Sequence, residues 1–320
     1  MISTGRIFIT EGTDPYRNLA LEELLMNEVR PHEVILYLWQ NDRTVVIGRN
    51  QNAWQECSAD RILAEGGHVA RRKSGGGAVY HDLGNQNYTL LYRKEDLQET
   101  KLNDVLFRTA EKLGLNAEFT GRNDLTVNGR KFSGCASYDN GHIAYRHGCI
   151  LISTDMEKMR EYLTPSRLKL AAKGVASVES RVINLSECSH VTPALWRDAM
   201  ISAFREVFSL TGCEVFDDAH MPVNREQLEK LTEAYADETW IFGKLRAFDQ
   251  TLSLKTEYGL FTLRLSLEDG LIRDAEVFTD AMDTETAPVL AKKLKGLPYR
   301  KEEIDGAVLA VLGKQDEKTV

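Results

Sequence analysis

The feature that most restricts the fold of this chain is a series of short strand-like segments joined by Asn-Gly pairs. An Asn-Gly pair favours the two-residue turn of a β-hairpin, because both residues adopt positive φ at little cost. Hairpins pair neighbouring strands antiparallel, which does not fit a steady alternation of strand and helix. The segments are 117–120, 124–127, 131–136 and 143–152, and the turns are Asn128-Gly129 and Asn140-Gly141.

The residues around these hairpins mix helical and extended patterns. Apolar residues at helical spacing predict helices, and short runs of branched and aromatic residues predict strands. We therefore expect an α+β fold with a mixed or largely antiparallel sheet and flanking helices. The predicted helices are 17–29, 60–64, 102–113, 155–162, 193–208 and 225–235, and the further strands are 33–39, 44–47, 68–70 and 87–92.

The pattern changes after Thr239 and predicts a second, smaller unit. We expect a large domain over residues 1–240 and a small α+β domain over 241–320, the latter near the lower end of ordinary domain sizes. Its predicted strands are 247–254, 260–267 and 271–278, and its predicted helices are 285–294 and 301–312.

Composition excludes several classes of partner. The net charge of −8 gives no general positive field, so nucleic acid and anionic membranes are not expected partners. Residues 1–10 do not form a signal peptide, and no apolar run approaches a membrane span. Five scattered cysteines without metal-like spacing indicate reduced thiols, so we expect a cytoplasmic protein.

The stretch 71–82, Arg-Arg-Lys-Ser-Gly-Gly-Gly-Ala-Val-Tyr-His-Asp, is the strongest candidate for a ligand site. Glycines admit close ligand approach, and a glycine turn can present several N–H donors to an anion. Arg71 and Arg72 could add charge-assisted hydrogen bonds. A flexible turn with solvated arginines is the alternative. The stretch lacks the spacing of a P-loop or a dinucleotide fold.

A second cluster joins Asp124 to Lys131 across the Asn128-Gly129 turn. If the hairpin forms, a carboxylate and an ammonium lie on paired strands. Lysine can stabilise a phosphate or a polarised carbonyl, and aspartate can hold magnesium or accept a proton. A surface ion pair of little value is the alternative.

A third cluster lies in residues 168–185, where Lys169, Lys173 and Arg181 surround small residues such as Gly174 and Ser177. Such a segment suits a loop that closes over a ligand, and an ordinary basic connection is an equal alternative.

Other polar and aromatic residues favour structural roles. His142 and His147 bracket a strand on opposite faces, which argues against a shared metal. The four tryptophans, Trp54 included, are expected in the core. Cys135 and Cys149 lie near the proposed site, but neither has a clear base partner, so a cysteine nucleophile is discounted.

In combination and order, these clusters resemble the two-domain lipoate–protein ligases of the A type. The family's Arg-Arg-x-x-Gly-Gly-Gly-x-Val-x-His-Asp loop resembles 71–82, and its Gly-Arg-Asn-Asp-Leu and Lys-x-Ser-Gly-x-Ala elements resemble 121–125 and 131–136. Further matches are 18–23, 45–52, 169–185, 240–243 and 277–280, so the resemblance covers nearly the whole chain. The chain departs from the family at Cys135 and in 146–149, where the family usually has His-His-Gly-Thr.

The resemblance implies a biotin/lipoate ligase-like fold and activation of lipoate with ATP and magnesium. The lipoyl group of lipoyl-adenylate would pass to one lysine of an acceptor, either an E2 subunit of a 2-oxoacid dehydrogenase or the glycine-cleavage H protein. ATP and lipoate would be substrates, and no tightly bound prosthetic group and a monomer are expected. The rivals are an ATP-independent octanoyl or lipoyl transferase, a biotin ligase and a non-enzymatic binding module.

By the same resemblance, Lys131 would contact both the lipoyl carbonyl and the α-phosphate, and Asp124 would position magnesium or the acceptor amine. The lipoate pocket would be lined by Arg71, Ser74, Gly75, Gly76 and His81. The nucleotide would be contacted by Arg72, Gly77, Ala78, Val79 and Tyr80, with Lys173, Gly174 and Ser177 in the closing loop.

Overall fold

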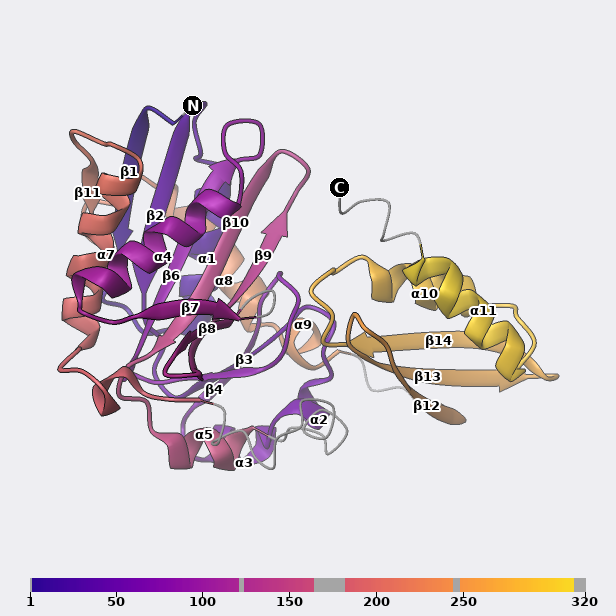
Figure 1. Cartoon of the computed structure of the whole chain (residues 1–320). Coiled ribbons are helices and arrows are strands. Elements are labelled where there is room, and N and C mark those ends of the chain that lie inside the picture. The colour runs from indigo at the N-terminus through magenta and orange to yellow at the C-terminus, as the bar shows by residue number, and fades with distance from the viewer. Residues whose placement is uncertain (1, 121–123, 164–181, 244–247, 314–320) are drawn as a thin grey trace.

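The computed structural model describes residues 2–120, 124–163, 182–243 and 248–313. Its centre is a mixed sheet of eight strands in the order β11-β1-β2-β6-β10-β9-β8-β7 (Figure 1). The strands are β1 (Thr4–Ile9), β2 (Glu33–Trp39), β6 (Asn85–Arg93), β7 (Ala117–Thr120), β8 (Asp124–Val127), β9 (Arg130–Asp139), β10 (Ile143–Leu151) and β11 (Glu214–Phe216).

The sheet is antiparallel from β2 to β7 and parallel only where β1 meets β2 and β11. Both predicted hairpins are confirmed. Asn128 and Gly129 have φ of 52° and 72°, and Gly141 has φ of 98°. Positive φ at both positions is the geometry that an Asn-Gly turn adopts. The α+β class is therefore confirmed, whereas β1 and β11 were not predicted.

Two helix pairs cover the two faces of this sheet (Figure 1). On one face, α4 (Thr100–Lys112) and α7 (Pro193–Val207) pack against each other, with Trp196 fully buried. On the other face, α1 (Pro15–Met26) packs against α8 (Arg225–Ala236) and against buried residues of β2. Asp14 caps α1 by accepting hydrogen bonds from the first-turn amides, so the helix begins at Pro15.

A small sheet, β4-β3-β5, carries the glycine loop. Its strands are β3 (Thr44–Ile47), β4 (His68–Arg71) and β5 (Val79–His81), and the loop joins β4 to β5. Trp54 is 49% exposed, so its expected place in the core is wrong. Its ring packs against the ring of Phe242. Short helices pack around this sheet, namely α2 (Ala53–Glu56), α3 (Ala59–Ala64), α5 (Met156–Tyr162) and α9 (Glu238–Phe242).

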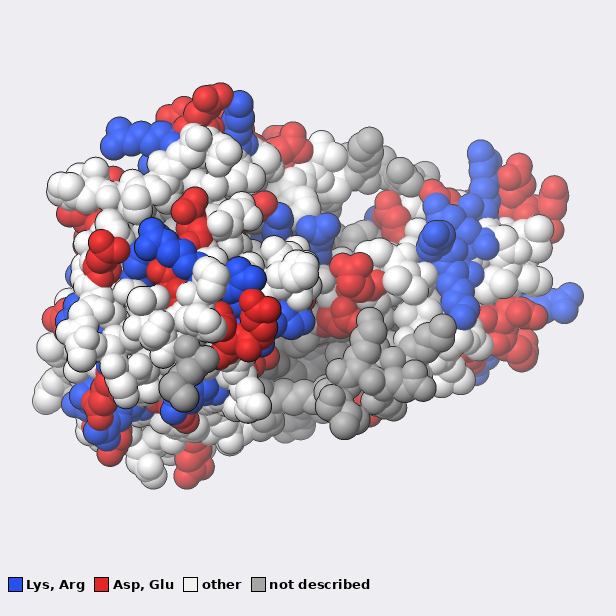
Figure 2. Space-filling view, turned by 90° about the horizontal axis from the view of Figure 1, so that it is seen from above, with Lys and Arg blue, Asp and Glu red and all other residues white. Residues whose placement is uncertain are grey.

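The C-terminal unit has its own sheet and core. The three predicted strands and two predicted helices are confirmed, as β12 (Gln250–Lys255), β13 (Leu260–Glu268), β14 (Leu271–Thr279), α10 (Thr286–Leu294) and α11 (Lys301–Leu312). The boundary near residue 240 stays a prediction. Figure 2 shows a group of Lys and Arg side chains over this unit with Asp and Glu side chains beside it. The last turn of α10 contains Lys292 and Lys293.

The described ranges contain neither a membrane-spanning helix nor a preformed metal centre. No helix there has both the length and the apolar character needed to cross a membrane. No group of three or more His, Cys, Asp and Glu side chains in those ranges is arranged to hold a metal ion.

Candidate active site

The glycine loop is shaped from inside by the buried guanidinium of Arg72. Its Nη2 donates to the carbonyls of Gly75 at 2.8 Å and Gly77 at 2.7 Å, and its Nε donates to Ser74 Oγ at 3.1 Å. A trans peptide holds the N–H opposite its carbonyl. The amides of Gly76 and Ala78 therefore point away from Arg72. Burial lowers the pKa of Arg72 to about 10, which still leaves the group charged near neutral pH.

Arg71 is turned toward the protein as well. Its Nη1 donates to the carbonyl of Gln51 at 2.6 Å, and its Nε donates to that of Trp240 at 2.8 Å, near the end of α9. Burial, with a contribution from Arg49, lowers its pKa to about 10. In this arrangement both arginines hold backbone rather than face an open site. Direct contact of Arg71 with lipoate or of Arg72 with ATP remains a prediction and would require these bonds to be exchanged.

A segment of the C-terminal unit lies against the loop. The N–H of Gly76 donates to the carbonyl of Ala281 at 3.1 Å. A Cβ on Gly75 would lie 2.2 Å from the carbonyl oxygen of Met282, so only glycine permits this approach. Gly76 has φ of 88°, a conformation that also favours glycine. One outward-facing amide of the loop is therefore occupied by protein.

A β-bulge turns Lys131 onto the face of the sheet that carries Asp124. In the β8–β9 hairpin, Asp124 pairs with Gly134, but Thr126 pairs with Lys131 instead of Phe132. The extra residue changes the alternation by one, so Phe132 is fully buried in the core and Lys131 faces the other side. The predicted pairing of these strands is confirmed, and the bulge is the part that the sequence did not reveal.

Lys131 and Asp124 form an ion pair that is only partly shielded from solvent. Nζ lies 2.8 Å from Oδ1, and the side chains are 26% and 19% exposed. Gly134 makes room for the ammonium, since a Cβ there would lie 2.6 Å from Nζ. The carbonyl of Lys131 also accepts the N–H of Ile183 at 2.9 Å, which places 182–184 beside it.

The strand register aligns a row of site residues across this face. Antiparallel partners point to the same side of a sheet, and adjacent strands are about 4.8 Å apart. The row runs from β2 to β8 as Trp39, Asn87, Cys149, Gly134 and Asp124.

The next row contains the point where the glycine loop meets the sheet. It holds Tyr37, Thr89 and His147, two residues along their strands from the first row. Ser74 Oγ of the loop lies 2.7 Å from His147 Nε2. The loop and Lys131 therefore border the same sheet face. Cys135 faces the opposite side, where Arg146 Nη2 lies 2.7 Å from its sulfur.

His81 presents an unsatisfied nitrogen at the loop's end. Its Nδ1 lies 3.3 Å from the side-chain amide nitrogen of Asn41 and 3.4 Å from that of Asn87. As these nitrogens are donors, Nδ1 accepts and the ring proton sits on Nε2. Among the described residues, neither His81 Nε2 nor Asn87 Oδ1 has a partner, although both are buried. Burial, with a contribution from nearby Arg72, lowers the pKa of His81 to about 3. Such orphaned polar atoms are expected where a polar ligand binds.

His147 is the site residue that sequence reasoning missed. Its Nδ1 lies 2.8 Å from Glu22 Oε1 on α1, and its ring is buried. The sequence held one usable signal. The Asn140-Gly141 turn pairs the two strands, and alternation then places His147 and Cys149 on one face. Its spacing from His142 alone does not reveal this placement.

Of the other predicted residues, some lie in the small sheet and some lie outside the described residues. Val79 and Tyr80 belong to β5, and the Tyr80 ring packs on that of Tyr162. Lys173, Gly174 and Ser177 lie outside the described residues, as does 121–123 of the second cluster.

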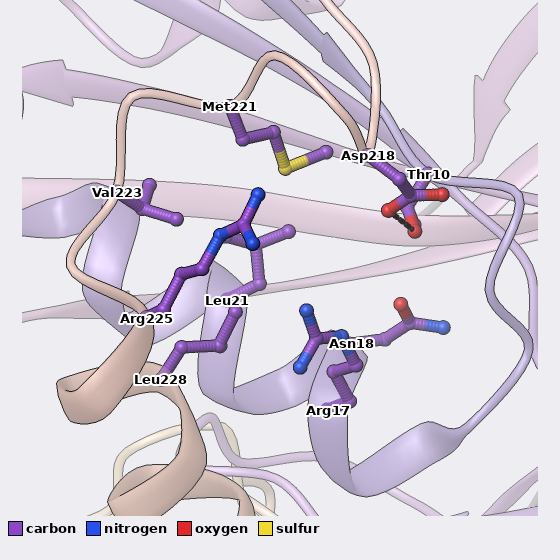
Figure 3. A pocket seen from close by; sticks show the side chains of 9 residues that line it. All are labelled: Thr10, Arg17, Asn18, Leu21, Asp218, Met221, Val223, Arg225 and Leu228. Carbon is purple, nitrogen blue, oxygen red and sulfur yellow. Dashed lines mark hydrogen bonds between the residues drawn. The ribbon is translucent and has the colours of Figure 1, made fainter.

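A surface pocket lies apart from these residues, and no predicted site residue lines it. Figure 3 shows the side chains of Arg17 and Arg225 pointing into it and Asp218 lying next to Thr10. Thr10 donates to Asp218 Oδ1 at 2.6 Å. The pocket therefore does not coincide with the candidate site formed by the loop, His81 and Lys131.

Comparison with known proteins connects this geometry to one family. Residues 14–205 match the model of the lipoyl protein ligase A/B catalytic domain, and residues 246–316 match the bacterial lipoate protein ligase C-terminus. Lipoate-protein ligase A of Psychrobacter cryohalolentis is 37% identical over 93% of this chain and 90% of its own length.

Two solved structures extend the likeness to the fold. P. falciparum LipL1 in complex with lipoate has a TM-score of 0.78 and 28% identity, over 95% of this chain and 93% of its own. A lipoate-protein ligase A bound with ATP has a TM-score of 0.61 and 26% identity, over 77% of this chain and 100% of its own. The fold is therefore that of the lipoate ligases.

Proposed function

This chain belongs to the lipoate–protein ligase A family, and from that premise we propose that it activates lipoate with ATP and transfers the lipoyl group to a protein lysine. In the first half-reaction, a carboxylate oxygen of lipoate attacks the α-phosphorus and pyrophosphate leaves. In the second, the acceptor amine attacks the acyl carbon of lipoyl-adenylate, AMP leaves, and the amine loses a proton. ATP bound to one similar structure and lipoate bound to another support both substrates.

The observation that carries this proposal is the bulge that aims Lys131 onto the sheet face beneath the glycine loop. The first step brings two anions together, so the site must neutralise their repulsion as the bond forms. An ammonium that is 26% exposed can exchange its bond to Asp124 for a phosphate or carboxylate oxygen. We assign Lys131 to the lipoyl carbonyl and the α-phosphate.

The glycine loop would supply the remaining contacts. Its outward amides and the orphaned Nε2–H of His81 suit a carboxylate or carbonyl, in line with the assignment of Ser74, Gly75, Gly76 and His81 to lipoate. The nucleotide would lie along Gly77 to Tyr80. For the Gly76 amide to reach a ligand, the Ala281 carbonyl must withdraw, which fits a hinge near residues 237–243 between domains 1–240 and 241–320.

Asp124 would hold magnesium once Lys131 has turned to substrate. Mg²⁺ takes one or two protein carboxylates and completes its shell with water and substrate phosphates. A single partly exposed carboxylate beside the lysine fits that requirement. The ion would neutralise phosphate charge, and Asp124 could instead orient the acceptor amine. The acceptors we propose are E2 lipoyl domains and the glycine-cleavage H protein.

The test separates the ligase from its ATP-independent rival. The protein is supplied with lipoate, ATP, Mg²⁺ and labelled pyrophosphate, and label entering ATP reports adenylation. We expect lipoate-dependent exchange, followed by a mass increase on apo-H protein when acceptor is added. No exchange, together with acyl transfer from an octanoylated carrier protein, would overturn the proposal in favour of an acyltransferase.

A further inference from the structure

We propose that Glu22, His147 and Ser74 form a directional hydrogen-bond relay that positions the glycine loop over the sheet face bearing Lys131. The three residues come from α1, β10 and the loop, and all are buried. His147 Nε2 lies 2.7 Å from Ser74 Oγ, and its Nδ1 lies 2.8 Å from Glu22 Oε1. The catalytic consequence rests on the proposed function, whereas the relay itself can be tested without it.

At each end of the network, the direction of the hydrogen bond is fixed by a group that can only donate. At one end, the Arg72 guanidinium can only donate, and it does so to Ser74 Oγ. At the other end, the indole N–H of Trp39 can only donate, and it does so to Thr89 Oγ1 at 3.0 Å. The Thr89 hydroxyl therefore donates its own hydrogen to a hydrogen bond with Glu22 Oε1, at 2.7 Å.

These fixed ends determine where His147 carries its proton. The carboxylate of Glu22 only accepts, so Nδ1 of His147 holds the hydrogen. Ser74 accepts from Arg72, and His147 Nε2 is the acceptor that the described residues offer to its own hydroxyl proton. A buried hydroxyl proton without an acceptor is costly. The bare Nε2 therefore receives it, and the ring hydrogen of His147 lies on Nδ1.

The relay also balances two buried charges that do not touch. Arg72 is cationic and Glu22 is anionic, and the charge of Glu22 favours the protonated form of Arg72. Ser74 and His147 connect them through a continuous line of hydrogen bonds. Because Ser74 directly precedes the three glycines, this line fixes the loop from beneath. Glu22 and His147 are thus positioning residues, and the Ser74 side chain positions the loop in addition to the lipoate contact proposed for this residue.

A relay makes a prediction that separately satisfied polar groups do not. No direct hydrogen bond joins Ser74 to Glu22, so if His147 did not couple them their substitutions would act nearly independently. If His147 transmits the effect of Glu22 to Ser74, removing either end should make the other largely irrelevant. The loop amides should respond in the same way as the chemistry.

The first experiment reads the proton on His147 directly. Nitrogen-15 NMR of histidine-labelled, full-length protein distinguishes protonated from bare ring nitrogens, and His147→Gln assigns the signal. We expect a protonated Nδ1 and a bare Nε2 in the wild type, and a population with the opposite tautomer in Glu22→Gln. A wild-type ring protonated on Nε2, or on both nitrogens, would overturn the relay.

The second experiment is a double-substitution cycle between Ser74→Ala and Glu22→Gln. Hydrogen exchange of the 74–80 amides and the kcat and KM for lipoate adenylation are measured on each variant. Each single change should lower kcat about tenfold, the size of one lost hydrogen bond, with KM for ATP less affected. The double variant should resemble either single variant.

The matched control is Glu23→Gln, the neighbouring glutamate on α1. Glu23 also reaches the loop, since its Oε1 lies 2.6 Å from Lys73 Nζ, but it is not in the relay. Its effect should add to that of Ser74→Ala. Additive effects of Glu22→Gln and Ser74→Ala would contradict the proposal. An absence of any adenylation would count against the proposed function, while the NMR and exchange results would still decide the relay.

Discussion

The glycine loop and the Asp124–Lys131 hairpin both carry cationic side chains. Those of the loop point into the protein, whereas that of the hairpin is partly exposed to solvent. The guanidiniums of Arg71 and Arg72 are buried and donate to backbone carbonyls, and Arg72 shapes the loop because its acceptors include Gly75 and Gly77. The ammonium of Lys131 is partly exposed and has a carboxylate partner that it can leave. The comparison suggests that the loop supplies oriented amides and the hairpin supplies the mobile charge.

Lys131→Ala removes the cation of the hairpin and should have the largest effect on the adenylation rate. Loss of a group that stabilises developing charge typically lowers kcat by about 10²–10³-fold, about 3–4 kcal/mol. The thermal midpoint should change little, because a partly exposed ion pair contributes little to stability. Pyrophosphate exchange measures the first effect and calorimetry the second.

Lys112→Ala is the matched control, since Lys112 is 28% exposed and ion-paired to Glu206 at 2.8 Å. It should leave exchange unchanged. If Lys131→Ala also retained full exchange activity, Lys131 would not be the group that stabilises the developing charge, and the opposed use of charge described above would be wrong.

Arg72→Met tests the glycine loop, and it should lower the free energy of unfolding more than it lowers the adenylation rate. The change leaves the carbonyls of Gly75, Gly77 and Val46 without their buried donor. We expect the free energy of unfolding to fall by about 2–4 kcal/mol, measured in urea. Arg61→Met, which removes an exposed arginine, should change it by less than about 0.5 kcal/mol. A stable Arg72→Met protein with weakened ATP binding would show instead that Arg72 is a ligand group.

Gly134→Ala sharpens the comparison, because it should displace Lys131 without unfolding the hairpin. The new Cβ would meet the flexible end of Lys131, 2.6 Å from Nζ, rather than backbone. We expect exchange activity to fall about tenfold, about 1.4 kcal/mol, with an unchanged thermal midpoint. Gly212→Ala, where no atom lies within 4 Å, should affect neither quantity. Full activity in Gly134→Ala would show that Lys131 acts from a different position.

The same two regions show how far the sequence reaches. Asn128-Gly129 is a local signal, so it predicted the hairpin and the approach of Asp124 to Lys131. The bulge at Phe132 was not predictable, because it depends on which side of the sheet the core occupies. Parallel pairing of β1 depends on β2 and β11, whose residues are remote in sequence.

The loop was found through its composition, but the direction of its charges was not. Paired arginines beside three glycines suggest an anion site whether the guanidiniums point outward or inward. Only the surrounding carbonyls, contributed by residues from Val46 to Ile241, turn them inward. The relay could not be predicted from the sequence for the same reason. Its members, Glu22, Ser74 and His147, come together only in the folded structure.

His81 lies at the end of the loop and supplies the prediction with the smallest effect. Its pKa of about 3 lies below the ordinary value of 6.5, because burial and Arg72 disfavour the charged ring. Between those values the unfolded chain binds a proton that the native protein does not. Stability contributed by the neutral ring is therefore present above pH 6.5 and is lost as the pH falls toward 3.

We expect His81 to contribute a loss of about 1 kcal/mol in the free energy of unfolding between pH 6.5 and 5.5. Urea unfolding at each pH measures this slope, which should be smaller in His81→Asn. His142→Asn, at an exposed histidine on the β9–β10 turn, should keep the wild-type slope. A His81→Asn protein with the wild-type slope would mean that His81 takes up a proton in the native state. The loop would then present a cation after all, and its contrast with the hairpin would disappear.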